Sequence, residues 1–163
     1  MNSTKVFAIV LGLVLALVLA LFGSAQPQEA FVGSWVLDPA NSKGPPGMVA
    51  TGGTLAITAA GGGKYTSVSE ATIGGMTGRS EITFSVDGKD YAVTTTPPQP
   101  GATITQSIAR ESATVYKSDL KLNGQLIATA MTEISSDGKT LTQTTTGVGQ
   151  FAALSGTSVF QRK

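Results

Sequence analysis

The fold is indicated most clearly by residues 113–134, which read ATVYKSDLKLNGQLIATAMTEI. On both sides of Asn123-Gly124 the pattern repeats every second residue, as expected for strands with one buried and one solvated face. An Asn-Gly pair is a strong signal for a tight hairpin, because both residues tolerate a positive φ. The stretch therefore predicts two antiparallel strands, over 113–122 and 125–134, joined by a two-residue turn.

The period of two continues along most of the chain after residue 30. Further strands are expected over residues 31–37, 55–57, 64–71, 82–86, 91–93, 104–108, 139–146 and 157–161. Tight turns are expected at 60–63, 87–88, 110–111 and 137–138, and longer connections at 38–52, 72–78, 96–101 and 147–155. Strands joined by short hairpins predict an all-β antiparallel meander of about 8–10 strands. Such a meander removes its open edges by closing into a barrel.

The first 25 residues have the three-part plan of a secretory signal. Lys5 is followed by an apolar run over residues 6–22, and Gly23-Ser24-Ala25 places small residues where a signal peptidase cleaves. We predict a helical signal peptide over residues 1–25 and one β-barrel domain over 26–163, exported to the periplasm or the extracellular space. The alternative is a retained membrane anchor, although the apolar run is shorter than the roughly 20 residues that span a bilayer. Membrane contact is expected only through this segment while it is uncleaved.

The chain contains no cysteine and no histidine, which removes several kinds of chemistry. Disulfides, thiolate nucleophiles, Ser-His-Asp arrangements and the ordinary zinc sites are all excluded. The chain carries 11 basic and 10 acidic residues, and removal of Lys5 with the signal segment leaves a neutral mature chain. Because nucleic-acid binding draws on clustered basic residues, no nucleic-acid partner is expected. We expect no metal and no cofactor either.

The remaining candidates for catalysis are Glu70, Glu81 and Glu133, which fall within predicted strands. A pair of carboxylates on neighbouring strands could perform acid–base chemistry of the glycosidase kind. The period of two instead places them on the solvent face, opposite to their apolar neighbours. The glycines before Lys64 are interpreted as a hairpin turn rather than a phosphate cradle, since neither a Ser/Thr nor a helix follows. We therefore predict that the protein is not an enzyme.

Gly33-Ser34-Trp35 resembles the Gly-x-Trp that opens the first strand of lipocalins and related calycins. A group of small exported bacterial lipocalin-like proteins, mostly uncharacterised, is similar at residues 33–43, 87–91, 136–142 and 159–162. The resemblance implies a lipocalin-like closed barrel with an apolar interior for a small hydrophobic ligand. It also implies that Trp35 packs across the closed end of the barrel, with Arg162 lying over it as a structural pair. A guanidinium over an indole face contributes about 0.5–2 kcal/mol.

Large side chains of the predicted strands are the candidates for the lining of the interior. As ligand-binding residues we single out Trp35, Tyr65, Phe84, Tyr91, Tyr116 and Leu120. The same side chains could instead form a filled core, since small barrels fill with side chains and larger ones keep a cavity. A cavity predicts an exported, non-catalytic, lipocalin-like protein that binds a small hydrophobic ligand. A filled barrel predicts an envelope structural or interaction module, or an inhibitor, whose protein partner is unknown.

Overall fold

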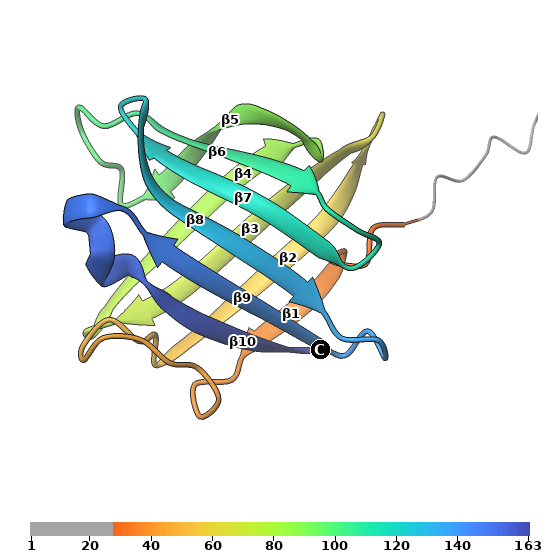
Figure 1. Cartoon of the computed structure of the whole chain (residues 1–163), viewed down its shortest axis with the longest axis horizontal. Helices are drawn as coiled ribbons and strands as arrows, with labels where there is room; N and C mark the ends of the chain where they lie inside the picture. Colours follow the sequence, from red (N-terminus) through yellow and green to blue (C-terminus); the bar gives the residue numbers. More distant parts are fainter. Residues whose placement is uncertain (1–27) are drawn as a thin grey trace, which may run out of the picture.

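Ten antiparallel strands follow one another along residues 28–163, the part of the chain that the computed structural model describes, and close into a barrel (Figure 1). The strands are β1 (Gly33–Leu37), β2 (Gly52–Gly61), β3 (Lys64–Ile73), β4 (Met76–Phe84), β5 (Asp87–Thr96), β6 (Ile104–Arg110), β7 (Val115–Leu122), β8 (Gln125–Ile134), β9 (Thr140–Gly147) and β10 (Gly156–Arg162). A short 3₁₀ helix, η1 (Gly149–Leu154), lies between β9 and β10.

The predicted signal segment and the cleavage site after Ala25 lie outside the described residues. The division into a segment over 1–25 and a domain over 26–163 therefore stays a prediction. Within residues 28–163, no helix has the length and apolar character that crossing a membrane requires.

Each strand pairs with its neighbour in the sequence, and β1 also pairs with β10, so that the ten described strands form a closed sheet. At the closure Trp35 lies opposite Arg162, and Leu37 lies opposite Phe160. Several strands are rich in threonine, as in β9, which reads TLTQTTTG. Side chains branched at Cβ pack well on a pleated surface and favour strands over helices. The predicted all-β antiparallel barrel is confirmed.

The predicted Asn-Gly turn joins β7 and β8. Asn123 has φ 51° and Gly124 has φ 80°, the two positive values that a type I′ hairpin requires. The side-chain oxygen of Asn123 also accepts a hydrogen bond from the amide of Thr103, at 2.8 Å. This turn therefore sets the register of the first two pairs, Leu122 with Gln125 and Lys121 with Leu126, and is held against the segment that leads into β6. The register of β7 and β8 then shifts by one residue, so that Leu120 pairs with Ala128.

The Asp87-Gly88 pair is not the hairpin turn that the sequence predicts. β4 ends at Phe84 and β5 begins at Asp87, so the pair lies inside β5. The pairing of β5 with β6 shifts register between Asp87 and Asp90, and Gly88 has φ 75°. A residue that tolerates positive φ serves a β-bulge as well as a turn. The same property of glycine thus produces a different element here.

The connection predicted over residues 72–78 is a tight turn. β3 continues to Ile73 and β4 starts at Met76, so Gly74-Gly75 alone reverses the chain. Both glycines have positive φ, 58° and 82°, which suits a two-residue hairpin. The connection predicted over 147–155 contains η1, a helical turn that the period-two pattern does not signal.

The end of the barrel that holds Trp35, the closed end, is filled with aromatic and branched side chains. Phe31 enters it from the segment before β1. Its ring centroid lies 4.6 Å from that of Tyr116, 5.1 Å from that of Tyr65 and 5.9 Å from that of Phe84. The full buried cluster, which we call the aromatic cluster, consists of Phe31, Trp35, Ile57, Tyr65, Ile82, Phe84, Ile108, Tyr116, Ile134 and Leu141.

The opposite end, the mouth end, is covered by residues 38–51 and by η1, which Figure 1 shows on the side away from the C-terminus. Lys43 and Thr157 exchange two backbone hydrogen bonds of 2.7 Å. This isolated bridge continues the pairing of β10 beyond the end of β1. The Ser42 hydroxyl also accepts a hydrogen bond from the Val159 amide, and the Thr51 amide donates to the carbonyl of Thr72. Residues 38–51 are therefore fixed to the barrel wall near both of their ends, although they form no strand of their own.

Candidate functional site

Three adjoining cavities occupy the interior of the barrel between the aromatic cluster and the mouth end. Their volumes are about 390, 280 and 90 Å³. Gln106 of β6 and Gln143 of β9 line all three. The cavities therefore meet at these two side chains, in the middle of the barrel.

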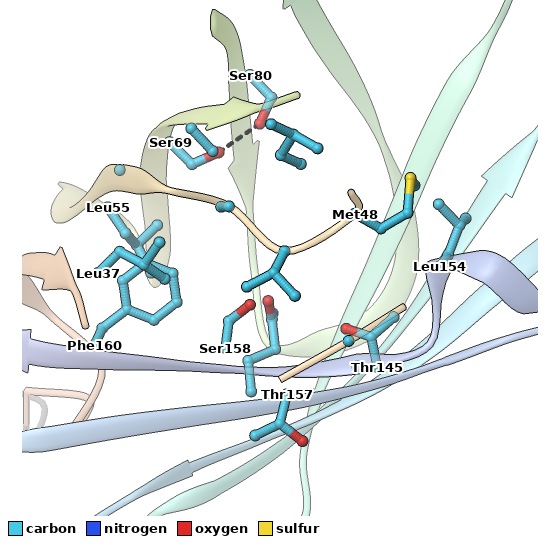
Figure 2. Close-up of a pocket in the computed structure, with 18 of the residues that line it drawn as sticks. Leu37, Met48, Leu55, Ser69, Ser80, Thr145, Leu154, Thr157, Ser158 and Phe160 are labelled. Atoms are coloured by element: carbon cyan, nitrogen blue, oxygen red, sulfur yellow. Dashed lines mark hydrogen bonds between the residues drawn. The ribbon is translucent and has the colours of Figure 1, made fainter. Parts of the chain in front are cut away.

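The largest cavity lies beneath residues 43–50 and η1 (Figure 2). Leu37, Leu55 and Phe160 form an apolar wall at one side, and Met48 and Leu154 lie at the other. Polar side chains complete the lining, and the hydroxyls of Ser69 and Ser80 bond to each other at 2.8 Å. The remaining hydroxyl side chains on this wall include Thr145, Thr157 and Ser158.

The second cavity, of about 280 Å³, lies between β4 and β9 on the other side of the barrel. Val93, Ile104 and Leu120 supply apolar surface, and the small side chains of Ala128 and Ala130 leave the space open. The smallest cavity, of about 90 Å³, lies against the aromatic cluster at the closed end.

Charged side chains are nearly excluded from these walls. None lines the cavities of about 280 and 90 Å³. Lys43 and Glu70 border the largest cavity, but both residues are exposed. Glu70 lies opposite Arg79 in the pairing of β3 and β4, on the outer face. The interior is therefore apolar and neutral, with hydroxyl and carboxamide groups set into it.

Catalytic arrangements are equally sparse among the described residues. Glu70, Glu81 and Glu133, the carboxylates that fall within strands, are all exposed. Between residues 28 and 163, no group of three or more acidic, histidine or cysteine side chains could hold a metal ion.

Trp35 and Arg162 meet at the closed end. The guanidinium carbon of Arg162 lies 4.1 Å from the centre of the Trp35 ring. Its nitrogens donate hydrogen bonds to the carbonyls of Ala30, Val32 and Gly138, at 2.9, 2.8 and 2.6 Å. The indole N–H donates to the carbonyl of Phe31 at 2.9 Å. Arg162 thus joins the last strand to the segment that precedes the first one.

Glu29 forms a second set of contacts at the closed end, and it is not among the residues predicted from the sequence. Its buried carboxylate accepts a hydrogen bond from the Tyr116 hydroxyl at 2.7 Å and forms an ion pair with Arg110. Burial raises the pKa of Tyr116 above its ordinary value, so the neutral phenol that donates this bond is the favoured form. No strand or turn pattern covers Glu29, so no sequence signal pointed to it.

The six predicted ligand-binding residues separate into two groups. Leu120 lines the cavity of about 280 Å³, and Phe84 and Tyr116 line the smallest one. The other three line none of these cavities: Trp35 and Tyr65 belong to the aromatic cluster, and the Tyr91 hydroxyl donates to Asp87 at 3.0 Å.

The polar lining is what the sequence interpretation missed. Gln106 lies between Ile104 and Ile108 on one face of β6, and Ser118 lies between Tyr116 and Leu120 on one face of β7. A polar residue in the middle of an otherwise apolar strand face indicates a polar group on the inner side of the barrel. The residues predicted from the sequence are mainly aromatic, so they do not include Gln106 or Ser118.

Comparison with known proteins supports the fold. No protein-family model matches the chain, and no curated protein matches it. Among solved structures, fatty-acid-binding protein 1 of Echinococcus granulosus matches with a TM-score of 0.58 and 20% identity, over 83% of this chain and 98% of that one. A mutant of the fluorescent protein UnaG matches with a TM-score of 0.57 and 19% identity, over 83% and 97%. The chain, a ten-stranded closed barrel, therefore shares its fold with these two solved structures.

Proposed function

We propose that this chain is a non-catalytic binding protein that holds a small, mainly apolar ligand inside its barrel. The observation that carries the proposal is the interior cavity of about 390 Å³, which adjoins a second of about 280 Å³. Ligand sites in proteins occupy roughly 300–1,000 Å³ and combine apolar walls with a few placed polar groups.

The composition of the walls supports this function over a purely structural one. A structural or interaction module needs no internal space, and a filled barrel is the more stable arrangement because each void loses packing contacts. Here the aromatic cluster fills only the closed end, while alanines and serines leave the remainder open. A solved neighbour with this fold carries the name fatty-acid-binding protein, which is consistent with an apolar ligand.

Export is a second part of the proposal and rests on residues 1–25 alone. The basic start, the apolar run and the small residues before Gln26 support cleavage after Ala25. The intact mass of protein released from expressing cells tests it, with Gln26 expected as the first residue. A full-length chain that remains with the membranes would instead indicate a retained anchor.

Ligand binding is tested with an uncharged solvatochromic probe such as Nile red and with native mass spectrometry of the purified protein. Ser80→Phe places a large ring where the two larger cavities adjoin, because Ser80 lines both. We expect probe affinity to fall at least about tenfold, or 1.4 kcal/mol. Thr83→Phe is the matched control, since Thr83 is exposed on the same strand.

Circular dichroism establishes that both variants keep the barrel. The proposal is wrong if the purified, delipidated protein binds no apolar probe. It is equally wrong if Ser80→Phe and Thr83→Phe bind the probe as tightly as the unmodified chain does.

A further inference from the structure

The polar groups of the interior gather where the three cavities meet. Gln106 and Gln143 line all three, and Ser67, Ser80, Ser118 and Thr145 each line two. We call these six residues the polar seam. They come from β3, β4, β6, β7 and β9, so the seam runs across the inside of the barrel rather than along its rim.

Much of the hydrogen-bonding capacity of the seam is unused by the protein. A carboxamide offers two donor hydrogens and an acceptor oxygen. Gln143 makes one long bond to the Thr132 hydroxyl, at 3.5 Å, and Ser80 bonds to Ser69 at 2.8 Å. Within residues 28–163 the carboxamide of Gln106 makes no hydrogen bond to another side chain. Both glutamines are half-buried, so an occupant that displaces water from their carboxamides is expected to carry complementary groups, since polar groups taken out of water are normally paired.

The seam has no charged partner for an ionised ligand. An ionised carboxylate taken out of water without a cation pays a large desolvation penalty. Lys43, the cation that borders the largest cavity, is exposed at the mouth end, and the acidic Glu70 borders the same cavity. The interior itself therefore offers hydroxyls and carboxamides but no charge.

We propose that the ligand is an uncharged amphiphile, an apolar chain or ring system whose hydroxyl, ester or amide groups bond to Gln106 and Gln143 at the polar seam. This inference rests on the proposed binding function and narrows it. An ionised fatty acid is the wrong ligand class for this interior. A purely hydrocarbon ligand is also disfavoured, because it leaves the carboxamides unpaired.

A matched series of lipids with one chain tests the headgroup. Oleate, oleamide, oleyl alcohol and monooleoylglycerol are each titrated against bound Nile red at pH 8, below their aggregation concentrations. Oleate is ionised at this pH, since free carboxylic acids titrate near pH 4–5. We expect oleamide and monooleoylglycerol to bind at least tenfold more tightly than oleate.

Substitutions in the seam then locate the recognition. Gln106→Leu should weaken oleamide at least fivefold while leaving Nile red binding within twofold. Gln106→Lys should raise oleate affinity at least tenfold, because it places a cation inside the cavity. Gln125→Lys is the matched control: Gln125 is exposed at the start of β8, so the same change there should alter neither affinity.

The outcomes distinguish a failure of the uncharged-ligand inference from a failure of the proposed binding function. Oleate binding that equals or exceeds oleamide binding overturns the uncharged-ligand inference and leaves the proposed function intact. If Lys43→Gln then weakens oleate binding, Lys43 holds the carboxylate at the mouth end, which overturns the inference and identifies where the acid binds. If neither Nile red nor any of the four lipids binds, the inference and the proposed function fail together.

Discussion

Removal of the Arg162 side chain is the sharpest test of how the barrel closes. Arg162 reaches three carbonyls, those of Ala30, Val32 and Gly138, while its guanidinium covers the Trp35 ring at 4.1 Å. Arg162→Ala therefore breaks contacts to the segment before β1 and to the turn before β9 in one step. We expect this variant to be folded but clearly less stable than the unmodified chain.

The size of the loss follows from these contacts. A hydrogen bond to a charged group contributes about 1.5–3 kcal/mol, and a cation over an indole contributes about 0.5–2 kcal/mol. Arg162 is exposed, so water replaces part of what the truncation removes. We expect a net loss of about 2–4 kcal/mol in the free energy of unfolding. Arg162→Lys keeps the charge without the planar fork and should lose about 1–2 kcal/mol.

Urea unfolding followed by circular dichroism and by Trp35 fluorescence provides the measurement. Arg79→Ala is the control, because Arg79 forms an exposed ion pair with Glu81 at 3.0 Å that contributes about 0–1 kcal/mol. Arg162→Ala within about 0.5 kcal/mol of the unmodified chain would refute the reasoning. So would an Arg162→Lys variant that is as stable as the original, because the fork geometry would then be irrelevant.

Three further predictions concern the closed end and one hairpin. Phe31→Ala should lower the free energy of unfolding by about 3–5 kcal/mol, because Phe31 is the centre of the aromatic cluster; a loss under about 1 kcal/mol in urea unfolding would contradict this. Tyr116→Phe should cost about 1–3 kcal/mol by removing the donor to buried Glu29. The pKa of Tyr116 is raised in the folded state, so its contribution to the free energy of unfolding is complete below about pH 10 and is lost as the pH rises through the raised value. Above about pH 10 the free energy of unfolding should therefore fall less steeply with pH in Tyr116→Phe than in the unmodified chain, and identical slopes would contradict this. Asn123→Ala should cost about 1 kcal/mol, and Asn123→Gly less, because residue 123 has φ 51°; equal thermal stability of the two variants would contradict the strain argument.

The fold was largely predictable because strand periodicity and turn chemistry are local properties. The alternation over 113–134 and the Asn123-Gly124 pair predict β7, β8 and their turn, as the structure has them. Errors arose where one residue type serves two elements. Gly88 tolerates a positive φ in a turn or in a bulge, and the choice depends on the pairing of β5 with β6, which is not local.

The closed end was predictable only in part. The resemblance to lipocalins pointed to Trp35 and Arg162, and the structure brings the two side chains together. Glu29 joins Tyr116 and Arg110 across more than 80 residues of sequence. A single buried carboxylate outside any periodic element carries no local signal, since its burial depends on how the segment before β1 packs.

The position of the cavity follows from the register of one hairpin. Along β3 and β4 the inward pairs become smaller step by step: Tyr65 with Phe84, Ser67 with Ile82, Ser69 with Ser80, and Ala71 with Gly78. The aromatic pair lies in the filled closed end, and the small pairs lie beside the largest cavity. A two-residue turn at Gly74-Gly75 fixes this register, whereas the longer connection predicted over 72–78 leaves it undetermined. A slip by one residue would turn Glu70 inward, so the neutral interior depends on the tight turn. The part of the cavity wall formed by β3 and β4 could therefore be located only once the length of this turn was known.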